Sequence, residues 1–158
     1  STFMTVEGST QGFISVGAFT PESVGNRFQK GHENQIMLES ISHGLSRPVD
    51  KNGRIAGERI RKPFVITKME DRASPLLVEA ARSGETLTEI VIHKYRTSYH
   101  GKPEQHYTIV LTDAMIVNMD TVNDTEMIEF TYRRIDYRHE TGATSSHDDL
   151  RTGYNEDS

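Results

Sequence analysis

The chain has 158 residues, of which 34% are apolar and 8% aromatic, so it is long enough to bury one hydrophobic core and we expect a single domain. It contains no cysteine, which excludes disulfides, thiolate catalysis and cysteine-based zinc sites. The net charge of −5 argues weakly against a nucleic-acid partner, and no apolar run is long enough to insert stably in a membrane.

Short strands are predicted in the first third of the chain. Residues 3–6 and 11–16 are apolar or β-branched runs bounded by Gly8 and Gly17. A polar stretch with several glycines follows as far as Glu33, and we expect irregular backbone there. Residues 35–43 contain four aliphatic or methionine side chains and predict another strand.

Residues 44–61 are predicted to form a long extended loop, because they contain four glycine or proline residues and few apolar ones. Residues 47–62 carry six basic side chains against two acidic ones. Two interpretations stay open: a solvated surface loop, or an element that becomes ordered against another subunit. The candidate subunit-contact and ring-stacking residues are its charged side chains: Arg47, Asp50, Lys51, Arg54, Glu58, Arg59 and Arg61.

One short helix is predicted at about residues 75–83, after a strand at residues 63–67. Ser74 is a suitable N-cap, Pro75 suits the first helical position, and Gly84 can adopt the left-handed conformation that ends a helix. Leu76, Leu77, Ala80 and Ala81 recur at helical spacing, so the helix has one apolar face to dock on a sheet.

The remaining chain to His139 is predicted to be β. Residues 87–96 and 105–112 form a hairpin, and residues 114–119 form a further strand. In the final strand the apolar positions change parity after Tyr132, which predicts a β-bulge at Arg133-Arg134. About seven to nine short strands and one helix indicate an antiparallel sandwich or barrel. We take residues 1–140 as one domain and residues 141–158 as an acidic, flexible tail.

The sequence contains no recognisable catalytic motif, so we expect no enzyme activity and no cofactor. None of the seven histidines is spaced as in a zincin helix, so no metal site is predicted. Residues 8–12 do not match a nucleophile elbow, and residues 25–31 do not match a phosphate-binding loop. The basic loop lacks the aromatic side chains of a single-strand nucleic-acid platform.

Four segments, taken in order, resemble the haemolysin-coregulated protein (Hcp) family of the bacterial type VI secretion system. They are GNRFQKGHENQI at residues 25–36, SHGLSRP at 42–48, TKMEDRASPLL at 67–77 and LTDA at 111–114. The resemblance continues through Tyr132-Arg133 and covers nearly everything from Met4 to Ser145. The tail departs from the family's usual ending because residues 147–158 are longer and more acidic.

The resemblance implies a compact antiparallel β-barrel of two sheets with a flanking helix. It implies a homo-hexameric ring that stacks into a hollow tube, with the type VI sheath, spike and small effector proteins as partners and effectors held in the lumen. The loop at residues 44–61 matches the family's extended loop, which contacts neighbouring subunits or rings. We therefore expect a bacterial cytoplasmic protein that is later secreted without a cleavable signal peptide.

Two other functional classes remain open at this point. A monomeric β-barrel binding module predicts a single chain with a closed apolar pocket. A small hydrolase predicts substrate turnover, although the chain has no extension large enough for a separate catalytic domain.

Overall fold

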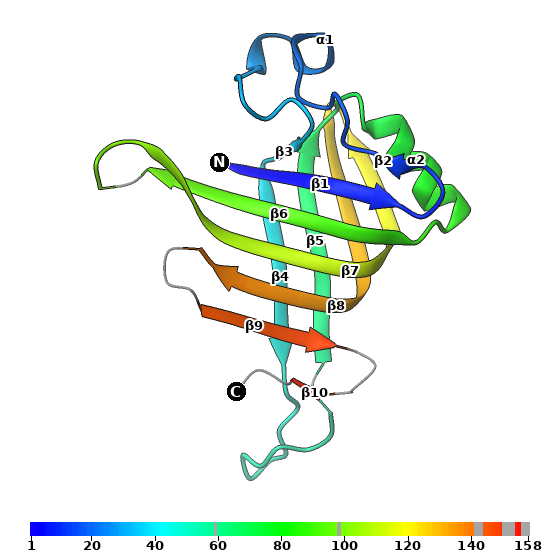
Figure 1. The fold of residues 1–158 in the computed structure, drawn as a ribbon. Coiled ribbons are helices and arrows are strands. Elements are labelled where there is room, and N and C mark those ends of the chain that lie inside the picture. The colour runs from blue at the N-terminus through cyan, green and yellow to red at the C-terminus, as the bar shows by residue number, and fades with distance from the viewer. Residues whose placement is uncertain (59, 98, 141–143, 150–153, 156–158) are drawn as a thin grey trace.

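The computed structural model describes residues 1–58, 60–97, 99–140, 144–149 and 154–155. Strands dominate it, with two α-helices and one 3₁₀ turn at its edges (Figure 1). The elements, in chain order, are β1 (Thr2–Gly8), β2 (Gly12–Phe13), α1 (Pro21–Val24), η1 (Gly25–Arg27), β3 (Ile36–Leu38), β4 (Ser40–Ser46), β5 (Ile60–Met69), α2 (Ser74–Ser83), β6 (Leu87–Thr97), β7 (Pro103–Val122), β8 (Thr125–His139), β9 (Thr144–Asp149) and β10 (Tyr154–Asn155).

The strands pair antiparallel and form two layers that share β7 and β8. One layer consists of β1, β6, β7, β8 and β9. The other contains the end of β7 and the start of β8, followed by β5, which pairs with β8, and β4, which pairs with β5 (Figure 1). On the same side of β8, residues Thr125–Phe130 pair with β5 and residues Arg134–His139 pair with β9. Each of these two long strands therefore passes from one layer into the other.

Both long strands interrupt, at one place, the alternation of buried and exposed side chains. On β7 both Leu111 and Ala114 are buried although they are three residues apart, and the same holds for Tyr132 and Ile135 on β8. Asp113 lies there with a φ of 51° and its carboxylate accepts a hydrogen bond from Arg133 Nε at 2.9 Å. The sequence correctly indicated a parity change after Tyr132. The predicted bulge at Arg133-Arg134 is wrong, because β7 makes the same change and the register does not shift.

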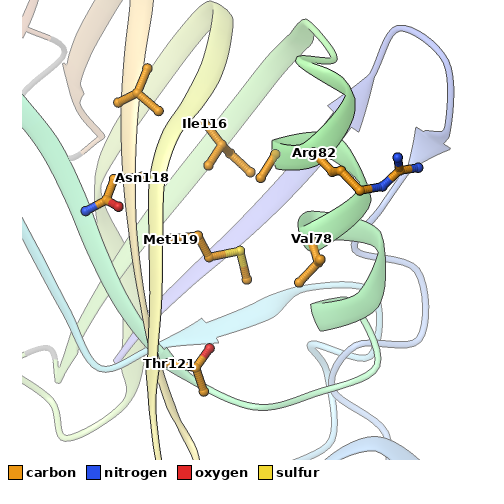
Figure 2. Close-up of a pocket in the computed structure, with 8 residues that line it drawn as sticks. Val78, Arg82, Ile116, Asn118, Met119 and Thr121 are labelled. Atoms are coloured by element: carbon orange, nitrogen blue, oxygen red, sulfur yellow. The ribbon is translucent and has the colours of Figure 1, made fainter.

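The register shift between β7 and β8 lies elsewhere, at Val117. Ile116 pairs with Phe130 and Asn118 pairs with Glu129, so Val117 is the extra residue. Such a residue bends the strand and redirects its neighbours. This bulge lies beside α2 (Figure 2).

The core lies between the two layers. β8 contributes Ile128 and Phe130, and β5 contributes Phe64 and Ile66, all at most 1% exposed. These side chains alternate with more exposed ones along each strand, as expected where one face of a sheet is buried. A smaller aromatic cluster, built on Phe3 and Phe19, closes the end near α1.

The helix α2 runs from Ser74 to Ser83, close to the predicted range. Gly84 has a φ of 70° and takes the predicted left-handed position. The N-cap is Ala73, not Ser74, and no side chain caps the first turn. The Ser74 hydroxyl instead accepts the Asp71 N–H at 3.0 Å and donates to Glu126 at 2.8 Å. The hydrogen bond from Ser74 to Glu126, which is distant in the sequence, replaces the N-cap bond expected within the helix.

The mainly β, antiparallel fold class is confirmed. The sheet is not closed into one continuous ladder, because β3 pairs with β1 whereas β4 pairs with β5, and the chain steps between them at Glu39. The four-residue helix α1 was not predicted. Residues 144–149 of the predicted tail form β9 on β8, and most of residues 150–158 lie outside the described part of the chain.

Candidate functional site

The predicted loop is a hairpin that continues β4 and β5 away from both layers (Figure 1). We call residues 44–61 the extended hairpin. Its base is regular sheet, where Leu45 pairs with Arg61 and Ser46 pairs with Ile60. Beyond the base, Val49 and Ile55 form an isolated antiparallel bridge, and Ala56 N–H donates to the Pro48 carbonyl at 2.8 Å. The hairpin is therefore hydrogen-bonded both at its base and near its tip.

Asp50 organises the tip of the extended hairpin. Its carboxylate accepts the backbone N–H groups of Asn52 and Arg54, both at 2.9 Å. Its own N–H donates to the Arg54 carbonyl at 2.7 Å, and Gly53 supplies the positive φ of 80° that the turn requires. Asp50 was predicted as a subunit contact, and the structure assigns this carboxylate a role in shaping the tip.

The other predicted charges fall into three groups. Four of them are exposed along the hairpin: Arg47, Lys51, Arg54 and Glu58. Arg59 lies outside the described residues. Arg61 is half-buried, and its Nη1 donates to the carbonyls of Tyr132 and Arg133 at 3.2 and 3.3 Å.

Arg61 contacts β8 at the point where its edge changes partner from β5 to β9. Its guanidinium carbon also lies 4.9 Å from the centre of the Tyr132 ring, a cation–π geometry. The backbone carbonyls it bonds lie between the two ladders that flank this edge. Arg61 therefore fastens the base of the extended hairpin to the sheet of the same chain.

The extended hairpin also exposes apolar side chains that its charge and glycine content did not predict. Four aliphatic residues are 47–62% exposed there: Leu45, Val49, Ile55 and Ile60. A signal was available for two of them, because Val49 and Ile55 flank the turn at hairpin spacing and pair with each other across it. The surface is thus both cationic and apolar, which is the composition of a protein contact surface more than of a solvated loop.

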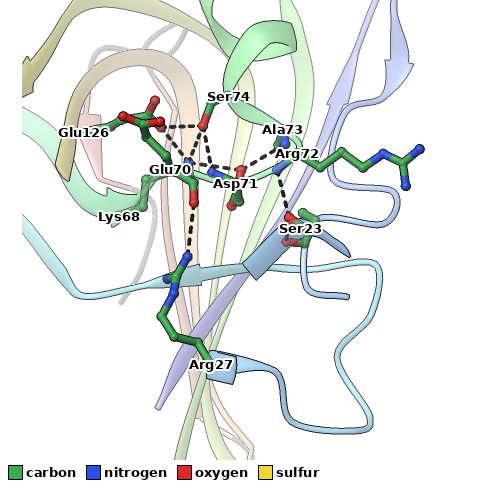
Figure 3. A network of polar contacts seen from close by, with 10 residues as sticks. Ser23, Arg27, Lys68, Glu70, Asp71, Arg72, Ala73, Ser74 and Glu126 are labelled. Atoms are coloured by element: carbon green, nitrogen blue, oxygen red, sulfur yellow. Dashed lines mark hydrogen bonds and ion pairs between the residues drawn. The ribbon is translucent and has the colours of Figure 1, made fainter. Parts of the chain in front are cut away.

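A buried polar network fixes the start of α2 (Figure 3). Lys68 Nζ lies 2.6 Å from Glu126 Oε1, 3.1 Å from Asp71 Oδ1 and 3.1 Å from Ser74 Oγ. Burial raises the pKa of Asp71 by more than the nearby Lys68 lowers it. The Lys68 side chain is fully buried, so this cluster holds structure and cannot receive a substrate.

Among the described residues, no group of three or more histidine, cysteine or acidic side chains is placed to hold a metal ion. Within the same residues, no helix has the length and apolar character needed to cross a membrane.

Comparison with known proteins identifies the family. A family model described as "Type VI secretion system effector, Hcp" matches residues 3–139. The "Major exported protein" of Pseudomonas aeruginosa is 45% identical over 163 residues, covering 95% of each chain. The secreted protein Hcp3 from Pseudomonas aeruginosa is 46% identical with a TM-score of 0.85, covering 94% of this chain and 99% of that one.

A second solved structure, titled as a crystal structure of Hcp protein, is 38% identical with a TM-score of 0.89. It covers 94% of this chain and 98% of that chain. The family model, the close relatives and the fold agree over nearly the whole sequence. The chain therefore belongs to the Hcp family of type VI secretion system proteins.

Proposed function

We propose that this chain is a structural subunit of the type VI secretion tube, in which hexameric rings stack through the extended hairpin. The observation that carries the proposal is the composition of that hairpin. It exposes four aliphatic side chains together with Arg47, Lys51 and Arg54. An ordered element that leaves the sheet with these groups exposed gains free energy when a partner covers it.

Repetition around a ring strengthens a contact that is weak in one copy. An exposed ion pair contributes about 0–1 kcal/mol, and burying apolar surface contributes about 25 cal/mol per Å². A ring presents the same contact once per subunit, so the contacts act together through avidity. A contact between two different surfaces of identical subunits does not close on itself and propagates along a tube.

Native mass spectrometry and negative-stain electron microscopy test the ring. We expect a complex of six 17.9 kDa chains and open circular particles. A sample that stays monomeric at high concentration would support the monomeric binding module and contradict the tube. Substrate turnover by the purified chain would support the hydrolase.

A salt series tests the contribution of the basic side chains to stacking. Raising the salt from 0.05 to 0.5 M shortens the screening length, so we expect stacked tubes to shorten while rings persist. Light scattering follows tube length, and native mass spectrometry follows the ring. Tubes whose length is independent of salt would contradict a contribution of the basic side chains and would leave the aliphatic side chains as the source of stacking.

Export and cargo follow from the same proposal. We expect the tube to be driven out of the bacterium by a sheath, behind a spike, and to hold small effectors in its lumen without any catalytic step of its own. The name of the Pseudomonas relative, "Major exported protein", supports export. Effector co-purification, read as added mass on the ring in native mass spectrometry, tests the cargo role.

A further inference from the structure

A chain of side-chain hydrogen bonds crosses β6, β7 and the end of β8 on the face that is turned away from the core. His93 of β6 is paired with Thr108 of β7, so both side chains point to the same face. Their neighbours Ile92 and Ile109 are fully buried in the core, which places His93 and Thr108 on the opposite face. Thr108 is nevertheless only 2% exposed.

The hydroxyl of Thr108 lies in the middle of this chain. Gln105 Nε2 lies 2.7 Å from Thr108 Oγ1 and 2.7 Å from His93 Nδ1. On the other side, Thr108 Oγ1 lies 2.6 Å from Glu140 Oε1, which also accepts a hydrogen bond from Arg138 Nε at 3.1 Å. We call His93, Gln105, Thr108 and Glu140 the relay.

The carboxylate at one end fixes the direction of every hydrogen bond in the relay. An ionised Glu140 can only accept, so the Thr108 hydroxyl donates its single hydrogen to it. The Thr108 oxygen must then accept from the Gln105 amide nitrogen, whose second hydrogen goes to His93 Nδ1. His93 Nδ1 therefore carries no proton, and the neutral ring has its hydrogen on Nε2.

The titratable and charged groups around His93 come from several elements. Arg138 and Glu140 lie at the end of β8, His32 precedes β3, and the Tyr95 ring centre on β6 is 6.5 Å away. Burial lowers the pKa of His93, Glu140 raises it, and Arg138 and His32 lower it, with a net shift below the ordinary value. His93 is therefore neutral at pH 7 and gains a proton on acidification.

Protonation of His93 reverses the relay. A proton taken from solvent on Nδ1 faces the hydrogens of the Gln105 amide, and half a turn of that amide brings its oxygen to the same place. This oxygen accepts from His93 and also faces Thr108, whose one hydrogen then turns toward it. Thr108 no longer donates to Glu140, and that carboxylate is left with Arg138 alone.

Glu140 stays ionised while this happens. The hydrogen bond from Thr108 holds the pKa of Glu140 below its ordinary value, and Arg138 acts in the same direction. The carboxylate therefore cannot take the place of the lost hydrogen bond by donating one itself. A proton on β6 thus breaks a contact of a residue that follows β8.

Glu140 begins the connection from β8 to β9. It follows His139, the last residue of β8, which pairs with Thr144 of β9. Among the described strands, only β8 and the two-residue β10 pair with β9. The bond from Thr108 to Glu140 therefore ties the start of this connection to β7.

We propose that the relay is a proton-operated latch, which holds the β8–β9 connection on β7 while His93 is neutral and loosens β9 when His93 is protonated. Loosening β9 frees the edge of β8 from Arg134 to His139, and an unpaired edge can accept a strand of another chain. The latch works within one chain and does not depend on the proposed tube function.

Solid-state nitrogen NMR of histidine-labelled protein tests the direction of the relay. In the wild type at pH 7.5 we expect the Nδ1 of His93 without a proton and the Nε2 with one. The spectrum of His93→Asn lacks this signal and so assigns it. A proton on Nδ1 at this pH would reverse the relay and overturn the latch.

Hydrogen exchange with mass spectrometry measures the loosening of β9. Exchange rates are divided by the intrinsic rate at each pH, so that protection factors are compared. Between pH 7.5 and about pH 5, we expect the protection of residues 144–149 to fall roughly fivefold more than that of β5, since one hydrogen bond to a charged group is lost. β5 pairs with the other half of the same edge of β8 and is the internal control.

Two variants hold the latch in its two states. His93→Asn places an amide oxygen near the position of Nδ1, where it accepts from Gln105 but gains no proton, so we expect the acid response of β9 to disappear. Thr108→Val keeps the shape of the side chain and removes the hydroxyl, so we expect low protection of β9 already at pH 7.5. Circular dichroism confirms that both are folded.

Matched controls are His100→Asn, at an exposed histidine, and Thr112→Val, one turn of the pleat pattern further along β7 on the same face. Both are expected to respond to acid as the wild type does. An acid response that persists in His93→Asn, or a loss of protection shared equally by β9 and β5, would overturn the latch. Either result would leave the proposed tube function untouched, because ring and tube assembly are measured separately.

Discussion

Lys68 and Glu126 form a buried ion pair, with Nζ and Oε1 2.6 Å apart and the two side chains 0% and 5% exposed. Lys68 comes from the end of β5 and Glu126 from the start of β8, and the pair lies beneath the first turn of α2 (Figure 3). A buried ammonium group is tolerated only where carboxylates and hydroxyls surround it. Here Asp71 and Ser74 complete that shell.

Removing the lysine charge is expected to destabilise the fold strongly. Lys68→Met leaves two carboxylates without their cation in a buried site, and breaking such a pair costs about 3–5 kcal/mol of the free energy of unfolding. Urea denaturation measures the loss. Lys62→Met, on the same strand but exposed, is the matched control and is expected to change stability by less than about 0.5 kcal/mol. Equal effects from the two variants would show that the network does not stabilise the fold.

Arg61 and Arg54 of the extended hairpin are expected to respond differently when each is replaced by alanine. Arg61→Ala loses two hydrogen bonds to β8 carbonyls and the contact with Tyr132, so we expect a loss of about 2 kcal/mol in the free energy of unfolding. Arg54→Ala is expected to leave thermal unfolding unchanged and to weaken self-association. A normal melting curve for Arg61→Ala, with impaired stacking, would assign Arg61 to the subunit contact instead.

Gly8 is expected to resist substitution because of a close approach by Glu85. A Cβ at Gly8 would overlap the Glu85 carboxylate. That carboxylate accepts the N–H groups of Thr10 and Gln11, both at 2.8 Å. Gly8→Ala is expected to cost about 1–3 kcal/mol, as overpacking does. If the overlap is the cause, adding Glu85→Ala will make the two losses less than additive in denaturation experiments.

The protonation of Glu85 agrees with that arrangement. Burial alone raises the pKa of this carboxyl, but hydrogen bonds from Gln11 and Thr10 outweigh it and hold the pKa below its ordinary value. A lowered pKa of an acid means that its contribution to stability is present at neutral pH and is lost as the pH falls through the folded-state pKa.

Acidification is also expected to act through His43. Burial lowers the pKa of His43, and Lys94 lowers it further. The unfolded chain then binds more protons than the folded one below about pH 6.5, so stability falls as the pH decreases from there toward the folded-state pKa. His43→Phe keeps the stacking on Phe64 and removes the titrating group.

We expect urea denaturation at pH 7.5, 6.5 and 5.5 to show a smaller loss of stability for His43→Phe than for the wild type. Burial also lowers the pKa of His93, so part of the pH dependence will remain. His100→Phe replaces an exposed histidine and is the control. An unchanged pH dependence in His43→Phe would exclude His43 as a source of acid sensitivity.

The sequence predicted the elements that depend on local chemistry. The end of α2 at Gly84 follows from the backbone freedom of glycine, and the strands follow from β-branched and aromatic runs. The start of α2 was predicted one residue late, because the Ser74 hydroxyl serves Glu126, which is 52 residues away. The long β7 was predicted as two strands, because Asp113 looked like a break although the ladder continues past it.

The candidate site was predictable in place but not in detail. The charge and glycine content located the extended hairpin, and four of its charged side chains are exposed. Asp50 and Arg61 depart from the predicted contact role. The partners of Asp50 are set by the turn geometry, and those of Arg61 lie on β8, about 70 residues along the chain.

The continuity of β7 and β8 through both layers has a mechanical consequence. Two layers joined only by flexible loops can slide or rotate past each other under load. Here a push on one layer is carried to the other by covalent backbone and by ladder hydrogen bonds that run through the corner at Asp113 and Arg133. The chain is therefore stiff against shear between its layers and responds to load as one rigid body.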